Sequence, residues 1–133
     1  MPQIPASHRH CPAGHSLAVL GDRWSMLIVR EALDGRDRYQ EFRDVLGISD
    51  NTLTRRLGHL QDAGILTRGT PESGEYRLTD AGRDLARVLA VLGDWAMNWM
   101  PVDTPLRPVP QAVVDAGTSL GLAIPAPEGE MLG

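Results

Sequence analysis

Residues 48–68 read ISDNTLTRRLGHLQDAGILTR, and this stretch decides the fold. Ser49 is a suitable N-cap, because its hydroxyl can accept a hydrogen bond from a free backbone N–H group in the first turn of a helix. Apolar residues then recur every three or four positions, which predicts an amphipathic helix over residues 50–63 that ends before Gly64. The apolar stripe consists of Leu53, Leu57, Leu60 and Ala63.

The polar face of this predicted helix carries short hydrogen-bonding side chains followed by arginines. Side chains of the first kind can read base edges in the major groove of DNA, and guanidinium groups can bind guanine or phosphate. Taken alone, the helix is equally well interpreted as an ordinary amphipathic surface helix. The candidates for DNA contact on the helix and its cap are Ser49, Asn51, Thr52, Thr54, Arg55, Arg56 and His59.

Two further helices are predicted upstream. Asp22 can cap a helix over residues 23–33, and a shorter amphipathic segment over residues 39–46 precedes the turn at Gly47. A short helix, a tight turn with glycine and a longer helix with a polar face are the parts of a helix-turn-helix. The residues of the 23–33 helix expected to face inward are Trp24, Leu27, Ile28 and Leu33.

A two-stranded hairpin is predicted after Gly64, with strands at residues 65–68 and 75–78 and a turn that holds two glycines and a proline. A hairpin in this place is the wing of a winged helix. Its candidate DNA contacts are Arg68 and Arg77, whereas Glu72 at the tip places an acid where a phosphate would lie.

A long helix is expected from the Thr79 cap to about Met100. Its apolar stripe is longer than the body of the domain can cover, and exposed apolar patches of that size normally mark an interface. We therefore predict a homodimer that pairs through this helix. The interface candidates are Leu85, Leu89, Leu92, Trp95 and Trp99.

Residues 1–10 are interpreted as a flexible arm, followed by a helix from Pro12 to about Leu20 with Cys11 as its N-cap. A helix N-terminus and nearby basic residues favour the thiolate, which makes Cys11 a candidate sensor of oxidants or electrophiles. The alternative, that Cys11 is simply a small buried apolar residue, fits the sequence equally well. The interior residues expected from this helix are Leu17, Val19 and Leu20.

Three histidines near Cys11 raise the question of a metal site, but their spacing matches no common zinc motif, and none is expected. The sequence also has no glycine-rich phosphate loop or nucleophile elbow, so we expect neither an enzyme nor a cofactor. No apolar run approaches the roughly 20 residues of a membrane-spanning helix. Together with the absence of a signal-peptide pattern, this predicts a cytoplasmic protein.

The charge of the chain is −4, whereas nucleic-acid-binding proteins usually carry a basic surplus. All 13 basic residues are arginines, and Arg107 against four acids in residues 101–133 accounts for −3 of the total. The body of the protein is therefore close to neutral, so DNA binding would depend on where individual arginines lie. A winged helix used only for protein contacts is the alternative that this charge favours.

Residues 101–133 contain six of the ten prolines and are interpreted as a C-terminal extension. A small hairpin is expected there, with strands near residues 113–114 and 120–124 and a turn at residues 116–119.

The chain from Cys11 to Trp99 resembles the HxlR-type winged helix-turn-helix transcriptional regulators. The resemblance rests on these features in order: Cys11-Pro12, the segment LGDRW at residues 20–24, Phe42 with Ile48-Ser49, Leu53-Thr54 with Leu57, Leu60 and Gly64, Tyr76-x-Leu78-Thr79 with Gly82, and Trp95. It implies a mainly α fold with a small β-hairpin, with residues 11–100 as one DNA-binding and dimerisation domain whose terminal helices pair. It also implies one recognition helix per half-site of a roughly palindromic operator, and in some members a sensing role for the cysteine that matches Cys11.

Overall fold

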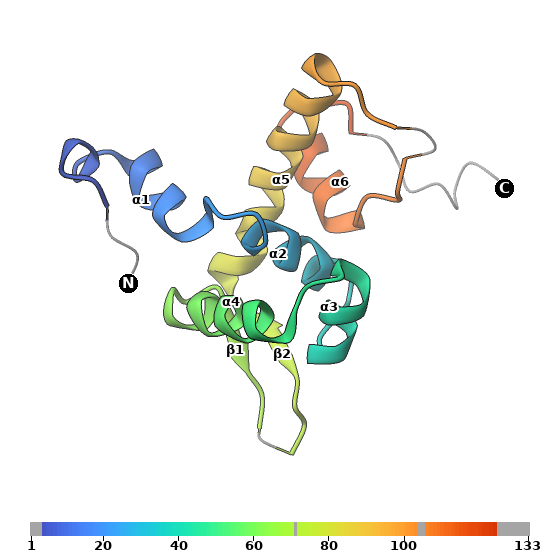
Figure 1. The fold of residues 1–133 in the computed structure, drawn as a ribbon. Coiled ribbons are helices and arrows are strands. Elements are labelled where there is room, and N and C mark those ends of the chain that lie inside the picture. Colours follow the sequence, from blue (N-terminus) through green and yellow to red (C-terminus); the bar gives the residue numbers. More distant parts are fainter. Residues whose placement is uncertain (1–3, 71, 104–105, 125–133) are drawn as a thin grey trace, which may run out of the picture.

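The computed structural model describes residues 4–70, 72–103 and 106–124. In that part of the chain, a short 3-10 turn η1 is followed by helices and one two-stranded antiparallel sheet (Figure 1). The elements in chain order are η1 (Ala6–His8), α1 (Pro12–Leu20), α2 (Ser25–Leu33), α3 (Tyr39–Leu46), α4 (Asp50–Asp62), β1 (Leu66–Arg68), β2 (Tyr76–Leu78), α5 (Asp80–Trp99) and α6 (Gln111–Ser119).

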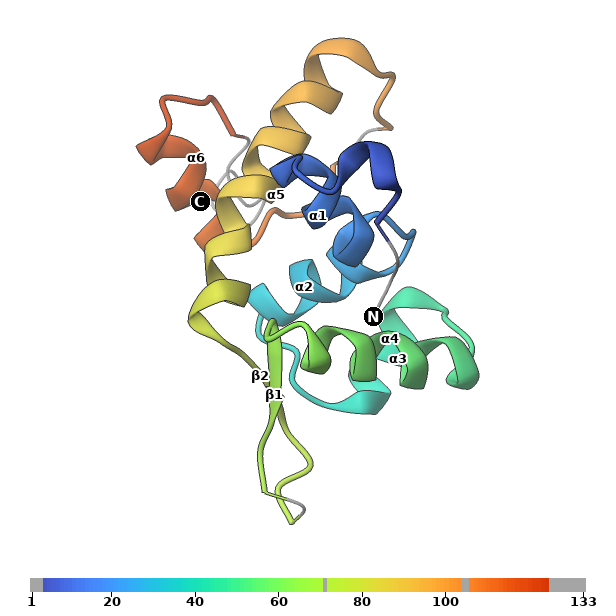
Figure 2. The same cartoon turned by 90° about the vertical axis from the view of Figure 1, so that its left-hand side faces the viewer.

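The β1–β2 hairpin projects beyond α4, on the side away from α5, as the two views in Figures 1 and 2 show. Leu66 pairs with Leu78, Thr67 with Arg77 and Arg68 with Tyr76. Helices α3 and α4 with the hairpin form the winged helix-turn-helix that the sequence predicts, which confirms the expected fold class.

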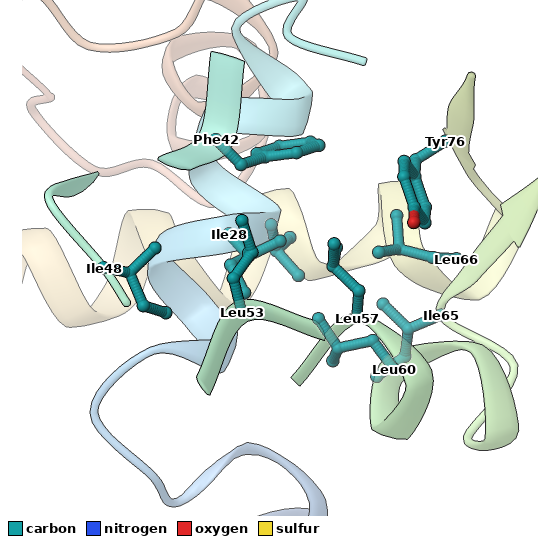
Figure 3. Close-up of a cluster of buried hydrophobic side chains, with 10 residues drawn as sticks. Ile28, Phe42, Ile48, Leu53, Leu57, Leu60, Ile65, Leu66 and Tyr76 are labelled. Atoms are coloured by element: carbon teal, nitrogen blue, oxygen red, sulfur yellow. The ribbon is translucent and has the colours of Figure 1, made fainter. Parts of the chain in front are cut away.

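The core lies between α2, α3, α4 and the hairpin (Figure 3). Leu53, Leu57 and Leu60 of α4 are all buried, as the stripe predicts. Phe42 of α3 meets the ring of Tyr76 edge-on, with the ring centres 6.3 Å apart. The leucine face of α4 is thus fixed on the core, which leaves its opposite face outward.

The helix termini follow the predicted caps. Ser49 Oγ accepts a hydrogen bond from Thr52 N at 3.4 Å, and Gly47 adopts a left-handed φ of 62° where α3 ends. Thr79 has three partners: its Oγ1 accepts from Gly82 N at 3.0 Å and lies 2.6 Å from Gly64 O and 3.2 Å from Ile65 O, to which its hydroxyl can donate.

Helix α2 begins two residues later than predicted. The N-cap position is Trp24 and not the predicted Asp22. Asp22 lies just ahead of the helix, where its Oδ2 accepts hydrogen bonds from the backbone N–H groups of both Trp24 and Ser25 at 2.9 Å. The inward face also differs from the expectation: Leu27 is exposed, and Val29 and Glu31 are buried. On α1, Leu17 is exposed as well, whereas Val19 and Leu20 pack on the core.

The hairpin predicted in the C-terminal extension is wrong, because residues 111–119 form α6. The prolines described nearby precede the helix, and Pro110 is its N-cap, so none interrupts it. Val113 and Gly117, about one turn apart, are both buried, and Val113 packs with Ala86 and Ala90 of α5. Ile124, expected in a strand, instead lies against Gly117 of α6. A Cβ at Gly117 would collide with the side chain of Ile124.

The expected arm, domain and extension boundaries fall partly outside the described residues, which exclude 1–3, 71, 104–105 and 125–133. In the described ranges, no helix combines the length and apolarity needed to traverse a lipid bilayer.

Candidate nucleic-acid interface

The outward face of α4 is a row one turn apart: Asn51, Arg55, Gly58 and Asp62. At about 100° per residue these four positions fall within about 60° of one another, opposite the buried leucines. Asn51, Arg55 and Asp62 are exposed, and nothing lies within 4 Å of where a Cβ on Gly58 would be. An approaching surface would therefore meet one amide, one guanidinium group and, at the C-terminal end, one carboxylate, with a helix position without a side chain between the last two.

Hydrogen bonds and an ion pair connect the first turn of α4 to α3. The hydroxyl of Tyr39 lies 2.9 Å from Asp50 Oδ1 and 3.3 Å from Thr54 Oγ1, and Arg43 Nη1 lies 3.6 Å from the same Asp50 oxygen. Ser49 Oγ donates to Thr52 Oγ1 at 2.9 Å. Three of the predicted site residues, Ser49, Thr52 and Thr54, thus hold the geometry of the turn that precedes Arg55.

Two other predicted residues on α4 face the α1–α2 connection. Arg56 Nη1 lies 3.5 Å from Asp22 Oδ1, and its Nε is buried without a partner among the described residues. His59 Nε2 lies 3.1 Å from Val19 O. Burial by itself raises the pKa of Asp22, but the hydrogen bonds from Ser25 and the backbone, with the charge of Arg56, hold that pKa below its usual value. This network sets the position of α4 relative to the end of α1.

The wing carries Arg68 and Arg77 at its two strands. The guanidinium of Arg68 lies 5.2 Å from the centre of the Tyr76 ring, a cation–π contact that leaves the side chain exposed. Arg77 is also exposed, but its Nη2 is paired with Glu75 Oε2 at 2.9 Å. The acid beside Arg77 would compete with a phosphate for it.

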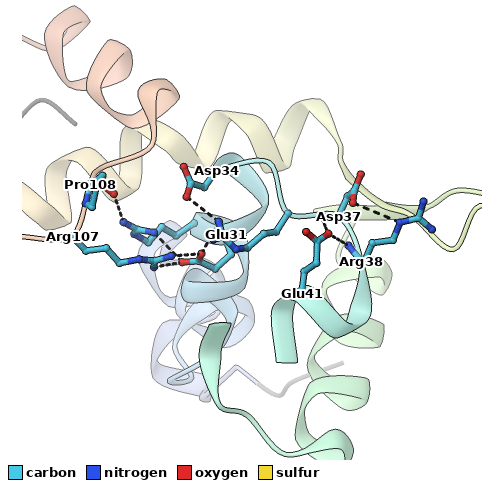
Figure 4. Close-up of polar contacts among 9 residues, drawn as sticks. Glu31, Asp34, Asp37, Arg38, Glu41, Arg107 and Pro108 are labelled. Atoms are coloured by element: carbon cyan, nitrogen blue, oxygen red, sulfur yellow. Dashed lines mark hydrogen bonds and ion pairs between the residues drawn. The ribbon is translucent and has the colours of Figure 1, made fainter. Parts of the chain in front are cut away.

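A residue that the sequence analysis missed is Arg38, the N-cap residue of α3, which contacts the wing on the turn side of β2. It donates to the Ser73 carbonyl, lies 3.7 Å from Glu75 Oε1 and remains half exposed. Next to it, Tyr76 N donates to Asp37 O at 2.7 Å, so the α2–α3 link is joined to β2. Glu41 Oε1 accepts from the backbone N–H groups of Asp37 and Arg38, and these hydrogen bonds, with that of Asp37 foremost, lower the pKa of Glu41 (Figure 4). No local pattern in the sequence connects Arg38 with the hairpin 35 residues away.

A family model described as HxlR-like helix-turn-helix matches residues 19–104, which contain α4 and the wing. This chain belongs to the HxlR-like helix-turn-helix family. Rv3095 of Mycobacterium tuberculosis, an uncharacterised HTH-type transcriptional regulator, is 41% identical over 92 residues, which are 66% of this chain and 58% of that protein. This chain therefore matches little more than half the length of that relative.

Two solved structures share the HxlR-like fold. PA1607, a candidate transcription factor, has a TM-score of 0.69 and 41% identity, with 76% of each chain covered. YodB of Bacillus subtilis in its quinone-bound form has a TM-score of 0.61 and 32% identity, with 67% of this chain and 99% of that chain covered. Each structure is therefore similar to this chain over about two thirds or more of its length.

Cys11 of this HxlR-like chain occupies the predicted N-cap of α1. Its Sγ is half-buried and lies 3.4 Å from Gly14 N. His15 Nε2 lies 2.6 Å from Arg9 O, which folds the segment before Cys11 back over the helix. Within the described ranges, the histidines, cysteine and acids form no group of three or more arranged to hold a metal ion.

The predicted dimer stripe of α5 divides in two. Leu85 and Leu89 are partly buried and pack on the core of the same chain. Leu92, Trp95 and Trp99 are exposed, with 55% of Trp95 and 76% of Trp99 accessible. Among the described residues, the exposed apolar surface of α5 is therefore concentrated in its C-terminal half, where it includes Val91, and it extends back to Val88.

Proposed function

We propose that this chain is a sequence-specific transcriptional regulator that inserts α4 into the major groove of double-stranded DNA. The observation that carries this proposal is the N-terminal part of the outward row, Asn51, Arg55 and Gly58, opposite the buried leucines and before Asp62 at its far end. Asn51 lies in the first turn, where a recognition helix meets base edges and an asparagine can bond adenine. Arg55, one turn later, can bind guanine or phosphate.

The remaining candidates divide by their partners. Arg56 and His59 act as positioning residues, because their partners Asp22 and Val19 belong to the same chain. Ser49, Thr52 and Thr54 hold the first turn and can present a hydroxyl to the DNA from its edge. Arg68 is the favoured phosphate contact of the wing, and Arg77 a weaker one because Glu75 already pairs with it.

The proposed active form is a homodimer that pairs through Leu92, Trp95 and Trp99 of α5. A two-fold dimer presents two copies of α4 to a roughly palindromic site, with half-sites about one helical turn, or 10–10.5 bp, apart. The apolar half of α5 supports this, since exposed surface of this kind normally marks an interface.

Cys11 is proposed as a sensor of electrophiles or oxidants. Its thiolate can add to a ring carbon of a quinone, forming a carbon–sulfur bond and, after proton uptake, a hydroquinone adduct. The quinone-bound form of YodB, which shares this fold, supports a quinone as the first electrophile to test. The adduct would crowd the short link between η1 and α1, where a Cβ on Gly14 would already meet His8.

Selection of bound duplexes from a random pool, followed by titration at several salt concentrations, tests DNA binding. We expect a negative slope of log affinity against log salt, because bound arginines release counterions. Arg55→Ala is expected to weaken operator binding by about 1–3 kcal/mol. Asn51→Ala should change the preferred sequence more than the non-specific affinity.

Arg87→Ala is the control, because Arg87 is also an exposed arginine on a helix, and it lies on α5, where it pairs with Asp84. Its operator affinity should stay close to that of the wild type. A flat salt response, with Arg55→Ala binding like the wild type, would instead favour the winged helix as a protein-interaction module, which the net charge of −4 also suits.

A further inference from the structure

Helix α6 packs beside α5 (Figure 1). A pocket lies between α5 and the C-terminal extension, lined by residues of both. Its volume is about 420 Å³, within the range of small-molecule sites. Leu89 and Met97 of α5, Val102 and Leu106 of the connecting segment, and Val113 and Ile124 form much of its apolar lining. Met97 and Val102 are exposed in part, so a molecule in the pocket would cover apolar surface that now meets water.

One edge of the pocket is basic. Arg30 and Arg107 line it, and both bind Glu31, a carboxylate with no exposed surface (Figure 4). Arg107 does so with two nitrogens, at 2.6 and 2.7 Å, and Arg30 also donates to Pro108 O at 2.7 Å. Arg36 lies 3.4 Å from Glu31 and pairs with Asp34.

Three guanidinium groups in this cluster thus face two carboxylates, which leaves one positive charge in excess. The side chain of Arg107 is about half exposed (48%), so it has N–H groups left for a further acceptor. An apolar cavity with one surplus cation at its edge complements a molecule that is apolar and carries a single negative charge.

We propose that this pocket binds a small apolar carboxylate, with its hydrocarbon part between α5 and α6 and its carboxylate at Arg107. Arg107 belongs to the extension and Glu31 to α2, next to the core residues Ile28 and Val29. A ligand that competes with Glu31 for Arg107 alters the contact between the extension and the helix-turn-helix. Ligand binding and DNA binding are then coupled, and this second step rests on the proposed function, whereas the pocket itself does not.

Octanoate is the probe, with 1-octanol as the neutral molecule of matching chain length. Ligands of about ten non-hydrogen atoms commonly reach a Kd near 1 mM, so calorimetry or NMR titration of the full chain should detect octanoate with a Kd of about 1 mM or tighter. Octanol should bind about tenfold more weakly, because it cannot pair with Arg107.

Gly93→Met is the blocking variant. Gly93 lines the pocket and has nothing within 4 Å of an added Cβ, so the side chain can enter the pocket without disturbing the helix. We expect it to weaken octanoate binding about tenfold or more. Gly58→Met is the control, since Gly58 is an equally open helical glycine on α4, away from the pocket, and it should leave octanoate binding unchanged.

Failure of octanoate to bind, or equal binding to Gly93→Met and the wild type, would overturn the proposal. Dissociation of a dimer by octanoate, with Gly93→Met itself monomeric, would also overturn it, because the pocket would then hold the second subunit. A change in operator affinity with octanoate that Gly93→Met abolishes supports the coupling. If octanoate binds but the chain binds no DNA, the proposed function fails and the pocket stands.

Discussion

Replacing Glu31 with glutamine is expected to destabilise the fold by about 3 kcal/mol, near the lower end of the range for removing one member of a buried ion pair. Glu31 has no exposed surface and receives hydrogen bonds from Arg30 and Arg107, with Arg36 at 3.4 Å. Glutamine keeps the volume but removes the only negative charge at the centre of the cluster. The cost stays near the lower end because Arg107 is half exposed and can turn toward water.

Urea unfolding measures this cost from the shift in the midpoint at an unchanged slope. Asp84→Asn is the control, because the exposed pair of Asp84 with Arg87 should contribute less than about 1 kcal/mol. A loss for Glu31→Gln no larger than that of Asp84→Asn would show that the cluster does not stabilise the extension against α2, and would refute the reasoning.

The stabilisation by Glu31 should also depend on pH. Burial by itself raises the pKa of Glu31, but the hydrogen bond and charge of Arg107, together with Arg30, outweigh it and hold the pKa below its ordinary value of 4.5. The unfolded chain therefore binds the proton more readily than the folded one. The stabilisation is present above pH 4.5 and is lost as the pH falls through the lower pKa of the folded state. The stability gap between wild type and Glu31→Gln should accordingly narrow in that window.

Three further variants test the other parts of the molecule. Gly58→Ala should raise the free energy of unfolding by about 0.5–1 kcal/mol, since alanine favours a helix and its Cβ meets no atom; a loss of stability in the same urea assay would contradict this. Trp95→Asp should convert a dimer into a monomer in sedimentation at micromolar concentration, and a wild type that is itself monomeric would count against the interface on α5. Cys11→Ser should bind the operator as the wild type does but no longer respond to a quinone. If Cys11 is only a packing residue, native protein should instead be alkylated about a hundredfold more slowly than a free thiol, and the serine variant should lose stability.

The sequence predicts well those elements whose structure depends on residues close together in the chain. Ser49 and Thr79 cap their helices, and the leucines of α4 are buried, because capping and helical periodicity depend on neighbours one turn away. Position on the outward face follows from the same periodicity, so Asn51 and Arg55 could be chosen before the structure.

Contacts between distant segments were not predictable in this way. Nothing near Arg56 or His59 in the sequence indicates that they meet Asp22 and Val19, and the same holds for Glu31 and Arg107, which are 76 residues apart. The sequence does not predict helix α6, because frequent prolines argue against a continuing helix. The prolines described near it are those that precede it. They lie before its first turn, where proline is tolerated.

The contacts of Thr79 affect how the two subunits of a dimer would be positioned on DNA. The Thr79 hydroxyl lies where β2 ends and joins two other segments: it is within hydrogen-bond distance of the carbonyls of Gly64 and Ile65 after α4, and it accepts from Gly82 N in the first turn of α5. The close approach of Gly82 to Ile65 leaves no room for a Cβ between them. The start of α5 is therefore held rigidly against the end of α4, and the two helix ends move together. In a dimer paired through α5, the angle between the two subunits would set the distance and orientation between the two α4 helices. A change in how the subunits pair would therefore change the spacing of the half-sites that the dimer can bind.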